Sequence, residues 1–234
     1  MKKALVLLSG GIDSTVCLAL AIKNHKKENV TTLCINYGQH NKKELEHAKK
    51  ICEYYQVPYN EVDITNIYKN SKSSMIETSN IEIPKESYDE QYKKLEKNEN
   101  VSTNVPFRNG IFLSICAGFA IENNADLIYY GIHTEEGIAR SLYPDCDEDF
   151  NQAMNLAIYL GSGKKVKITA PLSEIYKKDV IKLGKKLKVP FNLTWTCYEN
   201  KEKHCGKCTA CTDRIKAFKE NKIRDEVTYE EMYW

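Results

Sequence analysis

The chain has 234 residues, which is enough for one large α/β domain with a small appendage. Its 34 basic and 32 acidic side chains give a formal net charge of +2, so the charge does not favour a nucleic-acid partner, and we expect none. The first apolar run, at residues 4–8, is too short for the apolar core of a signal peptide or for a membrane-spanning helix. We therefore expect a cytoplasmic protein with no membrane partner.

The spacing of apolar residues predicts strands and helices that alternate along the chain. Strands are expected over residues 4–8, 30–35, 59–64, 127–132 and 166–168. Helices are expected over residues 14–24, 42–55, 108–124, 150–160, 178–187 and 214–221. Because strands separated by helices form right-handed βαβ units, the sequence predicts a Rossmann-like, doubly wound α/β fold with five parallel strands.

Two segments depart from this alternation. Residues 70–104 are rich in Lys, Glu, Asn and Ser and have few large aliphatic side chains. This composition favours a solvated insertion over a lid that closes on a ligand. The other segment lies near the C-terminus and contains a cluster of cysteines. We therefore expect an α/β nucleotide-binding domain over residues 1–190 and a small metal-binding region over residues 191–234.

The turn after the first predicted strand is rich in glycine and hydroxyl groups. It reads Ser9-Gly10-Gly11-Ile12-Asp13-Ser14 and leads directly into a predicted helix. Glycine lets the backbone adopt a positive φ and approach a ligand closely, and the free N–H groups of a helix N-terminus favour an anion. An ordinary strand–turn–helix corner would use the same glycines, so these alone do not define a site.

The complete string matches the S-G-G-x-D-S loop of the PP-loop ATP pyrophosphatases. This resemblance implies that ATP is cleaved between its α- and β-phosphates. It is not a Walker A loop, because no Gly-Lys-Ser/Thr ending follows. Asp13 alone would repel phosphate, so we infer a bridging Mg²⁺. We assign ATP binding to this turn, to the helix that follows it and to the end of the second strand: Leu8, Ser9, Gly10, Gly11, Ile12, Asp13, Ser14, Thr15, Val16, Cys17, Leu18, Asn36 and Tyr37.

Four of the nine cysteines lie close together near the C-terminus: Cys197, Cys205, Cys208 and Cys211. Two interlocked Cys-x-x-Cys pairs let successive thiolates face one centre from a tight turn. A closed site with four sulfur ligands has no open position for a reactive water, so the pattern predicts a structural zinc. A redox pair and an iron–sulfur cluster are the alternatives. His204 could substitute for one of these ligands, but we expect it to lie beside the site or at the surface.

Further polar residues follow the later strands, and in open α/β sheets the ligand lies beyond the carboxyl ends of the strands. Arg108 could hold a phosphate or carboxylate with its guanidinium fork, or could be an ordinary surface arginine. Asp145 could accept hydrogen bonds from the edge of a guanine-like base, or could serve only the turn in which it lies. Lys177 or Lys178 could reach a phosphate from the start of the last predicted helix of the main domain, or this lysine-rich stretch could be a solvated face.

Motifs along nearly the whole chain resemble the 7-cyano-7-deazaguanine synthases, the PP-loop family that makes the nitrile precursor of queuosine. The resemblance rests on short strings that follow the predicted strands and on the cysteine cluster: Ser9–Ser14, Asn36–Gln39, Val105–Asn109, Gly131–His133, Tyr143–Cys146, Ala170–Leu172, Thr194–Tyr198 and His204–Cys211. The departures, such as Phe107 and Asp147, lie around the predicted base pocket. They affect the choice of substrate more than the use of ATP.

The resemblance implies an ATP-dependent ligase that acts on 7-carboxy-7-deazaguanine and ammonia through an acyl adenylate and an amide. It also implies one structural zinc per chain and a homodimer. We assign catalysis to Asp13, Arg108 and Lys177. Substrate binding is assigned to residues of the later loops: Gln39, Arg108, Asn109, His133, Tyr143 and Asp145.

Three other functions fit parts of the sequence. A related enzyme could pass an activated deazaguanine to another acceptor. A tRNA-modifying PP-loop ligase or thiolase would need a basic RNA-binding surface, which the near-neutral charge does not favour. A non-catalytic module that binds zinc and a nucleotide would not need the polar residues gathered at the strand ends.

Overall fold

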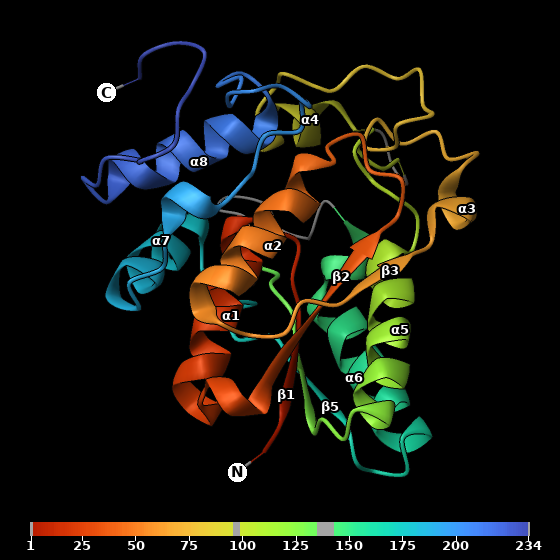
Figure 1. Ribbon diagram of the computed structural model, residues 1–234. Coiled ribbons are helices and arrows are strands. Elements are labelled where there is room, and N and C mark those ends of the chain that lie inside the picture. The colour runs from red at the N-terminus through yellow and green to blue at the C-terminus, as the bar shows by residue number, and fades with distance from the viewer. Residues whose placement is uncertain (1, 96–98, 135–142, 234) are drawn as a thin grey trace.

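A five-stranded parallel sheet forms the centre of the computed structural model, which describes residues 2–95, 99–134 and 143–233 (Figure 1). The strands are β1 (Ala4–Leu7), β2 (Val30–Asn36), β3 (Glu61–Asp63), β4 (Leu127–Tyr129) and β5 (Lys167–Thr169). Their order across the sheet is β3-β2-β1-β4-β5, and every neighbouring pair is parallel. The predicted doubly wound fold is confirmed.

The six predicted helices are all present, with ends that differ from the expected ones by a few residues. They are α1 (Ile12–His25), α2 (Lys43–Tyr55), α5 (Arg108–Glu122), α6 (Glu148–Gly161), α7 (Lys177–Lys186) and α8 (Thr209–Glu220). Two short helices were not predicted, α3 (Thr65–Tyr68) and α4 (Tyr88–Lys94). A capping box between Ser87 and Glu90 starts α4 within the polar insertion, because it satisfies N–H groups that a short helix leaves open.

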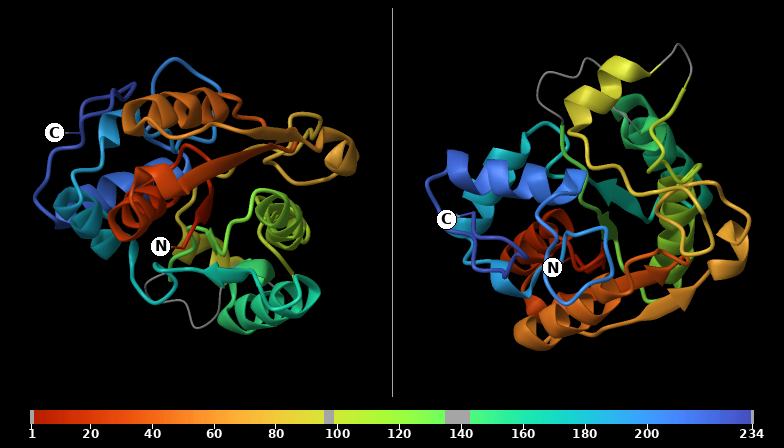
Figure 2. Two further views of the ribbon diagram at one scale, coloured as in Figure 1. Left: turned by 60° about the horizontal axis from the view of Figure 1, so that its bottom comes forward. Right: turned by 90° about the horizontal axis from the view of Figure 1, so that it is seen from above.

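Helices cover both faces of the sheet (Figures 1 and 2). Successive side chains of a strand point to opposite faces, so neighbouring residues of β1 belong to different cores. Val6 packs in the core formed with α1, α2 and α7, whereas Leu5 packs in the core formed with α5 and α6. Both side chains are fully buried. This central position of β1 places the turn that follows it in the middle of the molecule.

The insertion at residues 70–104 is packed over part of its length. Met75 and Ile76 are buried and pack in one cluster with Tyr37 and Phe112. The backbone of this part also joins the loop after β2, because the N–H of His40 donates to the carbonyl of Met75 at 2.7 Å. The expectation of a solvated insertion is therefore wrong for these residues. Residues 96–98 of the insertion lie outside the described part of the chain.

A buried arginine holds the C-terminal region together. Arg214 of α8 has no exposed surface and binds both carboxylate oxygens of Asp225, from Nε at 2.6 Å and from Nη2 at 2.9 Å. Its Nη1 donates to the hydroxyl of Thr194 at 2.9 Å. Burial alone would raise the pKa of Asp225, but the bonds from Arg214 and from the hydroxyl of Tyr229 outweigh it and lower that pKa.

We expect Asp225→Asn to lower the free energy of unfolding by about 3–5 kcal/mol, because it leaves the charge of Arg214 buried without its partner. Chemical denaturation near neutral pH measures this change. The contribution is fully present above the usual carboxyl pKa of 3.8 and disappears as the pH falls through the lower folded pKa, so the variant should approach the wild type in acid. As a control, Glu220→Gln breaks the exposed contact with Lys216 and should change stability by about 0.5 kcal/mol or less. Equal losses in the two variants would contradict this account.

Candidate functional site

A cavity opens beyond the carboxyl ends of β1, β2 and β4. Its walls include Leu8 and Ser9 after β1, Tyr37 after β2, and His133 after β4. Because β1 lies between β2 and β4, the chain leaves the sheet in opposite directions on the two sides of this point. Ligands of open α/β sheets bind at such a switch point.

The turn Ser9–Ser14 forms the floor of the cavity. Gly10 has a φ of +86°, and a Cβ there would lie 2.2 Å from the carbonyl oxygen of Glu44, so only glycine fits. The hydroxyls of Ser9 and Ser14 lie 3.0 Å apart, and Ser14 donates to the carbonyl of Gly11 at 3.2 Å. Backbone N–H groups and hydroxyls therefore gather at the N-terminus of α1, as an anion site requires.

Asp13, in the first turn of α1, is the centre of a charged cluster. Lys177 Nζ at the start of α7 lies 2.7 Å from Asp13 Oδ2, and His133 Nδ1 lies 3.5 Å from Asp13 Oδ1. Burial alone would raise the pKa of Asp13, but the charges of Lys177 and His133 outweigh it, so that pKa is lowered. Asp13 is thus a carboxylate at neutral pH. Oδ1 receives no hydrogen bond from the described residues, so it retains lone pairs with which it could bind a cation.

Arg108, the first residue of α5, also faces this cavity. Its guanidinium carbon lies 5.6 Å from the ring centre of Tyr37 and 5.7 Å from that of Phe112. Nη1 donates to the hydroxyl of Tyr37 at 3.5 Å, while the buried Nε makes no hydrogen bond with the described residues. Arg108 is therefore a cavity residue, and its guanidinium has a donor left for an anionic ligand.

Asp145, a predicted substrate residue, instead holds the start of α5. Its Oδ2 accepts from the backbone N–H of Asn109 at 2.7 Å, and its own carbonyl accepts from Asn109 Nδ2 at 3.1 Å. The side chain is buried and is not part of the cavity wall. Tyr143 and Asn109 do line the cavity, as does Gln39, which accepts from the N–H of Tyr37 at 3.0 Å. Asp145 thus acts on the site through Asn109.

Several residues assigned to ATP binding do not line the cavity; of these, Thr15 supports the turn and Asn36 supports the loop after β2. Thr15 donates to the carbonyl of Gly11 at 2.7 Å and is fully buried. Asn36 donates to Asp63 at 2.8 Å and accepts from the N–H of Gly38 at 3.2 Å, which fixes the loop after β2. The residues of this group are Gly10, Thr15, Val16, Cys17, Leu18 and Asn36.

Other residues of the cavity were not predicted. Glu44 of α2 lines the cavity wall. In the sequence it lies in a charged turn of a predicted helix, as many exposed residues do, so nothing there marked it as a site residue. Tyr88 of the insertion and Tyr198 of the C-terminal region also line the cavity, and their hydroxyls are hydrogen-bonded at 2.7 Å. Thr103 binds Tyr143, with 2.8 Å between the hydroxyls. The sequence indicated Thr103 as a site residue only by its position just before the Val105–Asn109 string.

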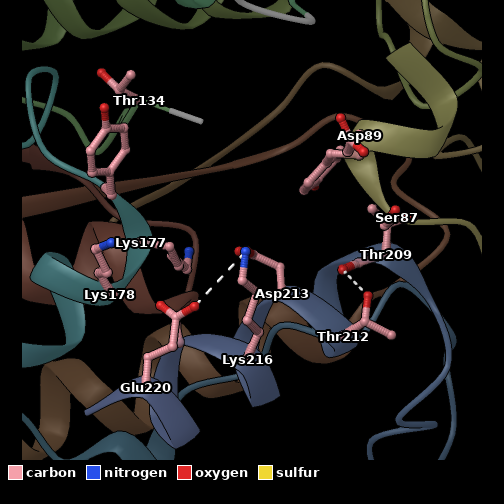
Figure 3. Close-up of a pocket in the computed structure, with 13 residues that line it drawn as sticks. Ser87, Asp89, Thr134, Lys177, Lys178, Thr209, Thr212, Asp213, Lys216 and Glu220 are labelled. Atoms are coloured by element: carbon pink, nitrogen blue, oxygen red, sulfur yellow. Dashed lines mark hydrogen bonds and ion pairs between the residues drawn. The ribbon is translucent and has the colours of Figure 1, made fainter. Parts of the chain in front are cut away.

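A smaller pocket adjoins the main cavity between α4, α7 and α8 (Figure 3). Lys177 and Asp213 line both pockets, so the two share a wall. Lys178 and Lys216 also lie on the walls of the smaller one, together with Glu220. Basic and acidic groups are mixed here, so the lining does not select a ligand by charge.

The four cysteines of the predicted metal site come together. Their sulfur atoms all lie within 4.8 Å of one another, all four side chains are buried, and none of the nine cysteines forms a disulfide. The Sγ atoms of Cys205 and Cys211 are 3.9 Å apart, close to the roughly 3.8 Å that Zn–S bonds of about 2.3 Å give in a tetrahedron. The N–H of Cys208 donates to Cys205 Sγ at 3.2 Å, which favours a thiolate. The cluster could therefore hold a metal ion.

His204 lies beside this cluster without being part of it. Its ring packs on Trp195 at 4.2 Å between centres, and its Nε2 accepts from the N–H of Thr196 at 3.3 Å. Burial lowers the pKa of His204 to about 3, so the ring is neutral. The side chain is buried and joins the cysteine region to the cavity wall, of which Trp195 and Thr196 are part.

None of the helices that the structure describes has the length and apolar character needed to cross a membrane.

The parallel sheet, the Ser9–Ser14 turn at its switch point and the nearby cysteine cluster define an α/β protein of the PP-loop class. The family described as queuosine biosynthesis protein QueC matches residues 3–222. The chain belongs to this QueC family.

Curated relatives share this similarity over nearly their whole length. A 7-cyano-7-deazaguanine synthase from Picrophilus torridus is 42% identical over 235 residues, which cover 99% of this chain and 93% of that protein. The protein of the same name from Caldicellulosiruptor saccharolyticus is 39% identical over 233 residues, covering 99% and 98%. Among solved structures, NMN synthetase from Francisella tularensis aligns with a TM-score of 0.48 and 17% identity, covering 95% of this chain and 78% of that one.

We expect Lys177→Met to raise the pKa of Asp13, because it removes the largest of the interactions that lower this pKa and leaves the effect of burial. Carboxyl carbon NMR on protein labelled at aspartate would measure the titration. Lys178→Met is the matched control, since the Lys178 ammonium lies over the ring of Tyr176, 5.5 Å from its centre. An unchanged titration of Asp13 in the Lys177 variant would contradict the charged cluster.

Proposed function

We propose that this chain is an ATP-dependent ligase that converts 7-carboxy-7-deazaguanine and ammonia to 7-cyano-7-deazaguanine. The observation that supports this most is the near full-length similarity to synthases of that name, in a chain whose sheet switch point holds the charged cluster of Asp13, Lys177 and His133. We place the reaction within queuosine biosynthesis, which the description of the matching family names.

In the proposed reaction, the substrate carboxylate attacks the α-phosphate of ATP, and pyrophosphate leaves. The acyl adenylate then reacts with ammonia to form the amide and release AMP. A second ATP activates the amide oxygen, and loss of that oxygen with AMP leaves the nitrile. Activation is needed because a carboxylate oxygen is a poor leaving group, whereas AMP is a good one.

The protein residues would position two anions and offset their charge. The N–H groups of the Ser9–Ser14 turn would receive the pyrophosphate part of ATP. Lys177 and Arg108 would stabilise the charge that develops on the phosphates and on the substrate carboxylate. Asp13 has an oxygen suited to Mg²⁺, and the ion would add charge neutralisation when bound. Asp13, Arg108 and Lys177 are thus the proposed catalytic residues.

The later loops would bind the deazaguanine. Gln39, Asn109, His133 and Tyr143 offer polar groups along the cavity wall, and Tyr37 and Phe112 offer aromatic surface next to Arg108. Asp145 would position Asn109 from behind.

We further propose that the four cysteines bind one structural zinc and that the chain forms a homodimer in the cytoplasm. The proposed division at residue 190 separates the ATP-binding part from the zinc region. The two parts share a core, in which Phe191 and Phe218 pack with residues of α1 and α7. Loss of zinc is therefore expected to affect the whole fold.

Mass spectrometry of the reaction products tests the proposed activity. Wild-type protein given ATP, Mg²⁺, ammonium and 7-carboxy-7-deazaguanine should yield the nitrile, AMP and pyrophosphate. Asp13→Asn should lower the rate about 10²- to 10³-fold, because it removes a charge placed for the transition state. Glu46→Gln, which changes an exposed residue of α2, should leave the rate unchanged. Nucleotide consumption that does not depend on the deazaguanine would contradict the proposal.

Metal analysis of freshly purified protein should find one zinc per chain. Cys208→Ser should lower the melting temperature and the yield of folded protein, because a structural metal contributes its binding energy to folding. Cys146→Ser changes a cysteine outside the cluster and should retain the metal. A wild-type protein without zinc, or with iron and sulfide in its place, would overturn this assignment.

A further inference from the structure

Of the carboxylates that line the cavity in the described part of the chain, Glu44 is the least compensated. The three are Asp13, Glu44 and Asp213. Asp13 is paired with Lys177, and Asp213 is shared with the smaller pocket that Lys178 and Lys216 line. The Glu44 carboxylate has no hydrogen bond or ion pair within the described residues. The side chain of Glu44 is partly buried at the cavity wall, and a carboxylate without a partner there favours a ligand that brings positive charge or N–H groups.

Glu44 lies next to the phosphate-binding turn. Its backbone carbonyl touches Gly10 so closely that a Cβ on Gly10 would be 2.2 Å from it. Arg108 and Tyr37 line the same cavity, and both are close enough to Glu44 to interact with it electrostatically. The carboxylate is thus placed by α2 on the wall of the cavity that also contains the Ser9–Ser14 turn and Arg108. An acyl adenylate would form in this space.

A base in this space would speed the proposed reaction. At neutral pH the nitrogen source is mostly ammonium, which has no lone pair for attack on a carbonyl carbon. A carboxylate can bind this cation and accept one of its protons. Of the proposed catalytic residues, Arg108 and Lys177 carry positive charge, which would repel ammonium, and Asp13 is held in the ion pair with Lys177.

We propose that Glu44 binds ammonium and acts as the general base that converts it to ammonia for attack on the acyl adenylate. This rests on the proposed synthase function. One N–H bond of ammonium breaks, and its proton goes to the Glu44 carboxylate. The freed electron pair forms the C–N bond, the C–O bond to AMP breaks, and AMP leaves with that electron pair. The nitrogen loses its second surplus proton to water, which leaves the neutral amide.

The environment of Glu44 suits this role. Burial raises the pKa of Glu44 to about 7, although the positive charge of Arg108 opposes the rise. A general base is most effective when its pKa lies near the working pH. Below this pH Glu44 would be protonated and unable to accept a proton. Apart from Arg108, the other ionisable groups of the cavity wall are the charged cluster of Asp13, Lys177 and His133, together with a cysteine, an aspartate and five tyrosines: Cys146, Asp213, Tyr37, Tyr88, Tyr130, Tyr143 and Tyr198.

The test compares two nucleophiles in the full-length protein. Ammonium needs a base, whereas hydroxylamine is largely neutral at neutral pH and attacks an acyl adenylate without one. Glu44→Gln should reduce kcat/KM for ammonium about 10²-fold. It should leave hydroxamate formation from hydroxylamine, and the KM for 7-carboxy-7-deazaguanine, unchanged. The rise of kcat/KM for ammonium near pH 7 should also be lost, apart from the rise that free ammonia itself causes.

The outcomes separate this inference from the proposed function. A parallel loss with both nucleophiles, or a raised KM for the deazaguanine with ammonium kinetics unchanged, would overturn the role of Glu44; the second result would make it a residue that reads the base. If the wild type forms neither the nitrile from ammonium nor the hydroxamate from hydroxylamine, the synthase function itself fails. Should Glu44→Gln not fold, Glu44→Asp shortens the side chain by one methylene, and an unchanged ratio of the two rates would likewise overturn the inference. Glu46→Gln, on the exposed side of the same helix, is the control.

Discussion

The ion pair between Asp13 and Lys177 is the interaction on which the site depends. It joins the first turn of α1 to the first turn of α7, two helices that follow different strands of the sheet. His133, after β4, approaches the same carboxylate. A negative group at a phosphate site is tolerable only when positive charge surrounds it, and here that charge comes from residues 120 or more positions away in the sequence. The fold therefore brings to the PP-loop turn the positive charge that the turn itself lacks.

The turn is also closely packed by the backbone of neighbouring elements. The backbone of α2 touches Gly10, and a Cβ on Gly131 would lie 2.8 Å from the backbone of Asp13. Helix α2 and the loop after β4 therefore approach the turn through backbone contact, and side chains there would push them apart. These backbone contacts fix the direction in which the N–H groups of the turn point. Pre-organised donors of this kind stabilise developing negative charge without a cost of reorientation during the reaction.

The sequence predicted those features whose signals are local. The Ser9–Ser14 turn and the four cysteines each lie within a short stretch, so the turn could be matched to a known loop and the cysteine spacing indicated a metal site. Alternating patterns gave the parallel sheet. It could not predict contacts made across the fold. Asp145 looked like a residue that reads a base, yet its carboxylate holds the N-terminus of α5. Met75 lies in a segment of polar composition and is nevertheless buried. Glu44 is a candidate site residue only because the fold places it on the cavity wall.

The central claim is that the carboxylate of 7-carboxy-7-deazaguanine attacks the α-phosphate of ATP. Substrate labelled with ¹⁸O in that carboxylate tests it most directly, with mass spectrometry of the nucleotide after one turnover. The account predicts AMP that carries one labelled oxygen, together with unlabelled pyrophosphate. Unlabelled AMP, or label in inorganic phosphate beside ADP, would contradict it.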